Sequence, residues 1–387
     1  MAFPASAVET FAPAARTATR GTVAVLYAVL FASTSVVIGV LWDISWHSTI
    51  GRDTFWSPPH VAIYVGGVVA GLSCGWLALR NTFAGTDAAR AESVRFWGFA
   101  APLGAWVSIW GALAMLTSAP FDDWWHNTYG LDVKILSPPH ALLASGISAI
   151  QIGAMLLAVA VQNRAGTASR RVPSLYLYAA GVLVLQFAIM ASEYMDRWNM
   201  HRSLFYQVAC GVFPFLLVST ARASVARWPA TVAALVYMGI TMAMMWILQM
   251  FEGRPLLGPI YVQLDRFVPP NFPLLIVVPA IAIDVVMRRI GRGRDWRLAA
   301  AIAIVFLAVF LPVQWVFADF YVSPWGRNWF FASHVMSYMV PPDFQQRFFQ
   351  LNPTDNLAMR LPIALLIGFV SARVGLWWGN WMSRVQR

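Results

Sequence analysis

The chain has 387 residues and a net charge of +10, and it is 59% hydrophobic but only 11% charged, with a mean hydropathy of +0.61. A soluble domain carries about a quarter of its residues as charged groups, so this composition excludes a soluble protein and predicts an integral membrane protein. Only one of the 27 basic residues is a lysine, and most of the arginines lie in short loops where they set membrane topology. The positive charge therefore indicates no nucleic-acid partner.

Apolar runs of about 20 residues, the length that crosses a hydrocarbon core as a helix, recur along the chain. They predict an all-α, polytopic fold with a short tail at 1–20 and one transmembrane domain at 21–387. Ten helices are expected, at 21–42, 58–79, 96–117, 138–161, 175–194, 205–221, 229–250, 270–287, 298–318 and 361–380. Paired in order they make five hairpins, at 21–79, 96–161, 175–221, 229–287 and 298–380, the last with a long outer segment at 319–360.

The loops between these helices alternate in charge. Loops after the even-numbered helices carry arginines, such as Arg288, Arg289 and Arg292, and the positive-inside rule predicts that these loops and both termini are cytoplasmic. The opposite loops contain 12 of the 17 acidic residues and all six histidines. We therefore expect a multi-pass protein of a bacterial-type inner (plasma) membrane, with its ionisable chemistry on the periplasmic or extracellular face.

Two of the outer loops share a motif. From Trp42 the first reads WDISWHSTIGRDTFWSPPH, and residues 122–140 read DDWWHNTYGLDVKILSPPH. When the Trp-His pairs are aligned, Gly51 matches Gly130, and after one inserted residue both copies end in Ser-Pro-Pro-His. The pattern predicts an internal repeat of the first two hairpins, with later copies diverged.

In each copy the spacing brings a carboxylate and two histidines together. An aspartate stands four residues before the first histidine, so both side chains share one helix face. The Pro-Pro step begins a helix well and places the second histidine in its first turn, at the outer membrane edge. The residues are Asp43, His47 and His60 in one copy, and Asp122, His126 and His140 in the other. Imidazoles with carboxylates and no thiolate favour copper or iron as the bound metal, with zinc as a third choice.

The expected roles follow from this chemistry. The metal ligands are expected to be His47, His60, His126, His140 and Asp123. The catalytic or supporting carboxylates are expected to be Asp43, Asp53, Asp122 and Asp132. An anionic headgroup or substrate is expected to meet Arg52, Arg197 and His201. For any one histidine, a hydrogen-bonding role at a helix end is the alternative.

The first loop resembles a known copper site. The spacing Asp43-x3-His47-x12-His60 is similar to the copper-ligating Asp/His/His set in the C subunit of the particulate methane and ammonia monooxygenases. The likeness spans residues 43–60, and the second copy has one more residue between its histidines. The resemblance implies copper chemistry at these loops.

The same stretch also resembles a second family. Asp43, Asp53 and the run WSPPHVAIY look like the first outer loop of integral-membrane glycosyltransferases that use polyprenyl-phosphate donors. That resemblance implies a general base at one of the two aspartates. Those enzymes do not require paired histidines or a second copy of the loop.

Three functions stay open on the sequence. The leading hypothesis is a metal-dependent membrane oxidoreductase, or its metal-handling partner subunit, acting near a lipid-soluble substrate such as a quinone. The second is a glycosyl or phosphoryl-group transferase with a lipid-linked donor. The third is a repeat-built transporter, although transport sites usually lie near the membrane midplane and not at one face.

Overall fold

A computed structural model describes residues 13–52, 54–130, 137–165 and 171–387 of the chain. Within the described residues, nine helices are long and apolar enough to cross a membrane. They are α1 (Pro13–Thr49), α2 (Pro58–Phe83), α4 (Leu103–Tyr129), α5 (Pro138–Ala165), α6 (Arg171–Ala191), α7 (Ser203–Ala223), α8 (Pro229–Leu248), α10 (Asp295–Val322) and α12 (Leu357–Met382). The chain is therefore an all-α, multi-pass membrane protein, since helices satisfy their backbone groups internally in lipid.

Short elements connect the long helices. They are α3 (Asp87–Ala91), β1 (Val94–Phe96), β2 (Phe99–Ala101), η2 (Arg197–Asn199), α9 (Val277–Ile290), η3 (Pro324–Gly326) and α11 (Pro342–Gln345). The strands β1 and β2 form an antiparallel hairpin, and its turn residues Trp97 and Gly98 both have positive φ. A helix predicted from residue 96 is therefore wrong at its start: α4 begins at Leu103 and runs on to Tyr129.

The predicted span at 270–287 is also wrong. The helix there, α9, has 14 residues, too few to cross a bilayer, and residues 267–275 before it have no regular secondary structure. Side chains from other helices accept hydrogen bonds from this buried segment. The bonds run from Phe272 N to Tyr321 Oη (3.1 Å), from Leu274 N to Tyr237 Oη (2.8 Å) and from Leu275 N to Gln314 Oε1 (3.1 Å). Non-helical backbone at this depth is tolerated because protein supplies these partners.

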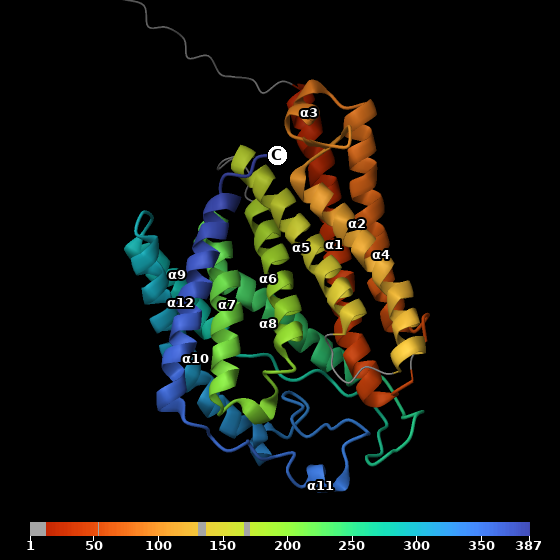
Figure 1. Cartoon of the computed structure of the whole chain (residues 1–387), viewed down its shortest axis with the longest axis vertical. Helices are drawn as coiled ribbons and strands as arrows, with labels where there is room; N and C mark the ends of the chain where they lie inside the picture. Colours follow the sequence, from red (N-terminus) through yellow and green to blue (C-terminus); the bar gives the residue numbers. More distant parts are fainter. Residues whose placement is uncertain (1–12, 53, 131–136, 166–170) are drawn as a thin grey trace, which may run out of the picture.

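The long helices form two groups, which Figure 1 shows side by side. In the first group α1 packs on α2 and α4 on α5, and the two pairs meet through α2 with α4 and α1 with α5. The second group contains α6 to α10 and α12, and it joins the first mainly through α5 and α6. The motif-bearing ends of α1, α2, α4 and α5 all lie at the lower end of Figure 1, opposite the arginine-rich loops.

Glycines allow α4 and α5 to approach closely. A Cβ atom on Gly111 would stand 2.6 Å from the Gly146 carbonyl oxygen, and one on Gly104 would stand 2.4 Å from the Gly153 carbonyl oxygen. Small residues permit such backbone contact between membrane helices. The close packing fixes the two limbs that carry the second motif.

Gly111→Ala should separate these limbs and lower the free energy of unfolding by about 1–3 kcal/mol, because the added methyl group overpacks the contact. Thermal unfolding of the purified protein in detergent measures the change. Gly75→Ala is the matched control, since no atom lies within 4 Å of a Cβ at Gly75 in α2. Equal destabilisation by both substitutions would contradict the tight α4–α5 contact.

Candidate metal centres

The first motif folds into a cluster of Asp43, His47 and His60 where α1 ends and α2 begins. The outgoing helix does not stop before His47, as the predicted span did, but continues to Thr49. Asp43 and His47 therefore lie one helical turn apart. The Asp43 carboxylate lies between the two imidazoles: Oδ1 is 3.2 Å from His60 Nε2, and Oδ2 is 3.8 Å from His47 Nε2.

The second motif folds into the corresponding cluster of Asp122 and His126 on α4 and His140 in the first turn of α5. The Nε2 atoms of both histidines are 3.5 Å from the same atom, Asp122 Oδ1. One ligand atom from each residue lies within 4.8 Å of the other two. Movements of about 1 Å would bring all three to the metal–ligand lengths of about 2.0–2.2 Å that nitrogen and oxygen donors adopt.

Backbone carbonyls orient one imidazole in each cluster. His60 Nδ1 lies 2.9 Å from Thr54 O, and His126 Nδ1 lies 3.0 Å from Gly130 O. A carbonyl oxygen only accepts, so each Nδ1 carries a proton, and in the neutral ring Nε2 then presents its lone pair to the aspartate. Lone pairs of Nε2 and of a carboxylate repel each other unless a proton or a metal ion lies between them. Metal-binding histidines commonly donate their other N–H to a carbonyl in this way.

The local backbone explains why the chain turns at the corresponding position in both motifs. Gly51 and Gly130 follow the two outgoing helices with φ of +81° and +83°, a conformation that favours glycine. Pro58 then lies in the first turn of α2, as predicted. Ser57 occupies the N-cap position, but its hydroxyl accepts from Thr54 N (2.7 Å) instead of from the helix.

Both clusters are partly accessible from the outer end of the molecule. The exposed fractions of their side chains run from 21% for His60 to 47% for His47. The Oδ1 atoms of Asp43 and Asp122 are themselves buried. A small ion can thus reach the imidazoles, while the carboxylate oxygen between them is kept away from bulk water.

The first cluster is additionally braced by the C-terminal half of the chain. Ser45 Oγ donates to Val268 O (2.5 Å), and Thr49 Oγ1 accepts from Val268 N (2.8 Å). These bonds lie on α1 beside Asp43 and His47 and attach it to the non-helical segment before α9. This segment thus supports the end of α1 that carries the first cluster.

Other residues predicted for the site lie apart from the two clusters or are not described. Asp123 accepts from Asn127 Nδ2 (3.3 Å) and is not one of the three residues that converge at Asp122. Arg52 is exposed beside the first cluster. Asp53 and Asp132 lie outside the described residues, so their catalytic roles stay predictions.

Arg197 and His201 lie in the second helix group. The buried Arg197 guanidinium donates to Ser333 O (2.6 Å) and Asn271 Oδ1 (2.7 Å). The His201 ring stacks on Trp315 with 3.8 Å between ring centroids. Both side chains are held by protein contacts, and their predicted substrate contacts remain untested.

Sequence reasoning did not anticipate the carbonyls that orient the rings. A signal existed for Gly130, because it aligns with Gly51 and both end a helix. Thr54 contributes its backbone carbonyl, and because every residue has one, the residue type at position 54 could not predict this contact. The bracing by Val268 joins positions 223 residues apart in the case of Ser45, and no local pattern predicts it.

No family model, curated protein or solved structure matches this chain. The class is set by the fold and the site alone. The chain is a multi-pass membrane protein in which Asp122, His126 and His140 form a triad that could hold a metal ion.

Proposed function

We propose that both clusters bind a transition metal, and that the protein works as a membrane oxidoreductase or as its metal-handling partner subunit, beside a lipid-soluble substrate. The observation that carries this proposal is the convergence of two imidazole Nε2 atoms on one aspartate oxygen, 3.5 Å from each. His126 is oriented through its other nitrogen by a backbone carbonyl, as metal-binding histidines are.

The repetition of the motif in two hairpins supports the proposed metal binding. We infer that the first two hairpins are copies of one metal-binding unit, because the same Asp-x3-His pair meets the same Pro-Pro-His step twice. The contacts of α2 with α4 and of α5 with α1 are those expected of two copies related by an axis along the membrane normal. A polar contact needed only to end one hairpin gives no reason for the same three side chains to converge in both.

The types of donor atom in the clusters limit which metal ions they can be expected to bind. Imidazole and carboxylate without thiolate favour copper or iron over zinc, and neutral imidazole is a poor ligand for calcium. Both cysteines are buried within helices. Three protein donors leave coordination positions open, so the bound metal would supply redox or Lewis-acid chemistry. The protein's part is to hold the imidazoles in one tautomer with the carboxylate between them.

The proposed orientation places both clusters on the outer side of the membrane, opposite the cytoplasm. The arginine-rich loops lie at the opposite end of the helices, and the positive-inside rule assigns that end to the cytoplasm. In a bacterial inner membrane the clusters would then face the periplasm, at the level where lipid-soluble substrates such as quinones meet water-soluble partners.

The metal content of the purified full-length protein, measured by mass spectrometry, tests the proposal. We expect up to two equivalents in the parent and none after alanine replaces His47, His60, His126 and His140. His201→Ala is the control, because the His201 ring stacks on Trp315 in the second helix group, apart from both clusters. A parent that binds no copper, iron or zinc after reconstitution with each would contradict the proposal.

A further inference from the structure

An open hollow lined by arginines lies at the other end of the molecule, where α7 ends, α8 begins and α9 ends. Its volume is about 140 Å³. An engineered cavity of about 150 Å³ holds a benzene molecule, so this hollow has room for a small chemical group and not only for water. It lies at the arginine-rich end of the helices, which the positive-inside rule assigns to the cytoplasmic membrane surface.

Positive charge dominates the lining. The arginines that line it are Arg222, Arg227, Arg288 and Arg292. The carboxylate in the lining is Asp284, which accepts from Ala230 N (3.2 Å) and Thr231 N (2.9 Å) at the start of α8. That carboxylate therefore serves the first turn of α8. Among the lining residues four arginines accompany this one acid, and Asp295, outside the lining, pairs with Arg222.

The arginines are held in place by neighbouring groups. Arg222 is 6% exposed and donates to Asn380 Oδ1 (2.6 Å) and Asp295 Oδ1 (2.7 Å). The Arg288 guanidinium lies 3.6 Å from the centroid of the Trp228 ring. Stacking uses the face of a guanidinium and leaves the N–H groups on its edge able to donate. Arg292 Nη2 donates weakly to Arg222 O (3.4 Å), which brings a third charge to the same place.

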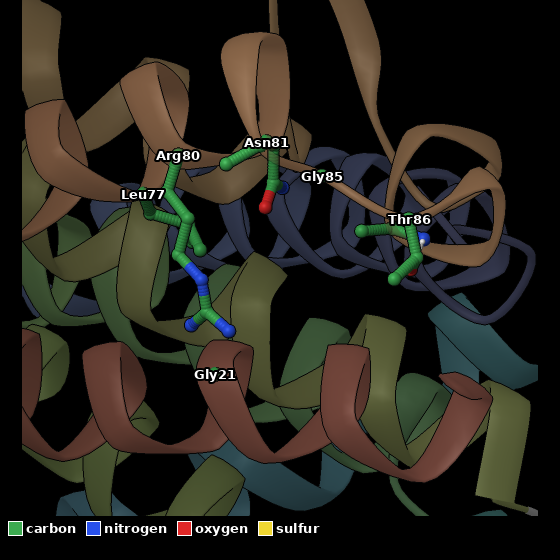
Figure 2. A pocket seen from close by; sticks show the side chains of 8 residues that line it. Gly21, Leu77, Arg80, Asn81, Gly85 and Thr86 are labelled. Atoms are coloured by element: carbon green, nitrogen blue, oxygen red, sulfur yellow. Dashed lines mark hydrogen bonds between the residues drawn. The ribbon is translucent and has the colours of Figure 1, made fainter. Parts of the chain in front are cut away.

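A second hollow at the same end, shown in Figure 2, is of a different kind. Its volume is about 40 Å³, and Arg80 is the arginine in its lining. The Arg80 side chain points at α1, where a Cβ on Gly21 would stand 2.9 Å from its Nη1 atom. This space takes a few water molecules at most, so we assign it to packing.

We infer that the larger hollow binds a phosphate group, either on the headgroup of an anionic lipid or as a soluble phosphate. Basic pockets between transmembrane helices on the cytoplasmic side bind anionic lipid headgroups. Arginine binds phosphate oxygens through pairs of parallel N–H donors, which a cluster of positioned guanidinium groups provides. This site is independent of the metal centres and acts at the opposite membrane face.

Native mass spectrometry of the full-length protein with added phosphatidylglycerol tests the site. The double substitution Arg288→Gln/Arg292→Gln should weaken lipid binding about tenfold or more. The matched control is Arg289→Gln/Arg294→Gln, which removes the same charge from exposed positions outside the lining. The control should change binding less than about twofold, and thermal unfolding checks that both variants keep the fold.

Inorganic phosphate separates the two sources of the ligand. If it displaces the lipid from the parent and binds the parent but not the hollow variant, the ligand is a soluble phosphate. If the lipid stays bound in its presence and phosphatidylcholine binds more weakly, the ligand is an anionic headgroup. Equal losses in the hollow variant and in the control would overturn the inference, as would a parent that binds neither probe.

Discussion

Asp122→Asn will lower metal affinity at the second cluster by about 100-fold or more, whereas Asp123→Asn will change it only a few fold. The Asp122 Oδ1 atom faces the Nε2 atoms of both histidines, at 3.5 Å from each. Asparagine removes the negative charge and can turn an NH₂ donor toward the metal. The neighbouring Asp123 instead accepts a hydrogen bond from Asn127, one turn further along α4. Equilibrium dialysis with the metal found in the parent measures both affinities.

The same kind of substitution tests whether the two clusters bind metal independently of each other. Each cluster draws its ligands from one hairpin, so Asp122→Asn should leave one equivalent of metal at the first cluster. Asp43→Asn should give the reverse pattern. Loss of metal in Asp123→Asn and not in Asp122→Asn would show that the Asp123 carboxylate, and not that of Asp122, binds the metal with the imidazoles. Loss of both equivalents in one variant would show that the clusters share a metal centre.

Local spacing was sufficient to predict the core of the candidate site. An aspartate four residues before a histidine can share its helix face only if the helix continues through both, and α1 and α4 do continue to Thr49 and Tyr129. The Pro-Pro steps begin α2 and α5 and set the second histidine of each motif. Each of these rules acts within a few residues, so no knowledge of distant contacts was needed.

The errors lie where distant contacts decide the structure. Residues 267–276 are apolar enough to be read as part of a span, yet 267–275 have no regular secondary structure, and hydroxyls of Tyr237 and Tyr321 accept N–H groups of this segment. The local signal was proline at 269, 270 and 273, which removes helix donors. The turn at Trp97 and Gly98 was likewise marked by a glycine between aromatic residues.

Arg197→Met will lower the free energy of unfolding by about 2–4 kcal/mol. The Arg197 guanidinium is 6% exposed and donates to the carbonyl of Ser333 and the amide oxygen of Asn271. Methionine fills similar space but leaves the buried carbonyl of Ser333 without this donor and removes the bond to Asn271. Asn271 belongs to the non-helical segment before α9, so the substitution should loosen the same segment that braces α1. Chemical unfolding in detergent measures the loss.

The pKa of His334 gives a second readout at the same place. Burial, and then the charge of Arg197, hold the pKa of His334 below its ordinary value, so Arg197→Met should raise it. Arg347→Met is the control, since Arg347 is exposed on the same outer segment and should change stability by less than about 0.5 kcal/mol. If Arg197 instead serves mainly to hold a substrate, its loss would reduce turnover while stability stayed as in the parent. A fall in stability would assign Arg197 to the frame that supports α1 at the first cluster, and a raised His334 pKa would confirm that the Arg197 charge acts on this imidazole.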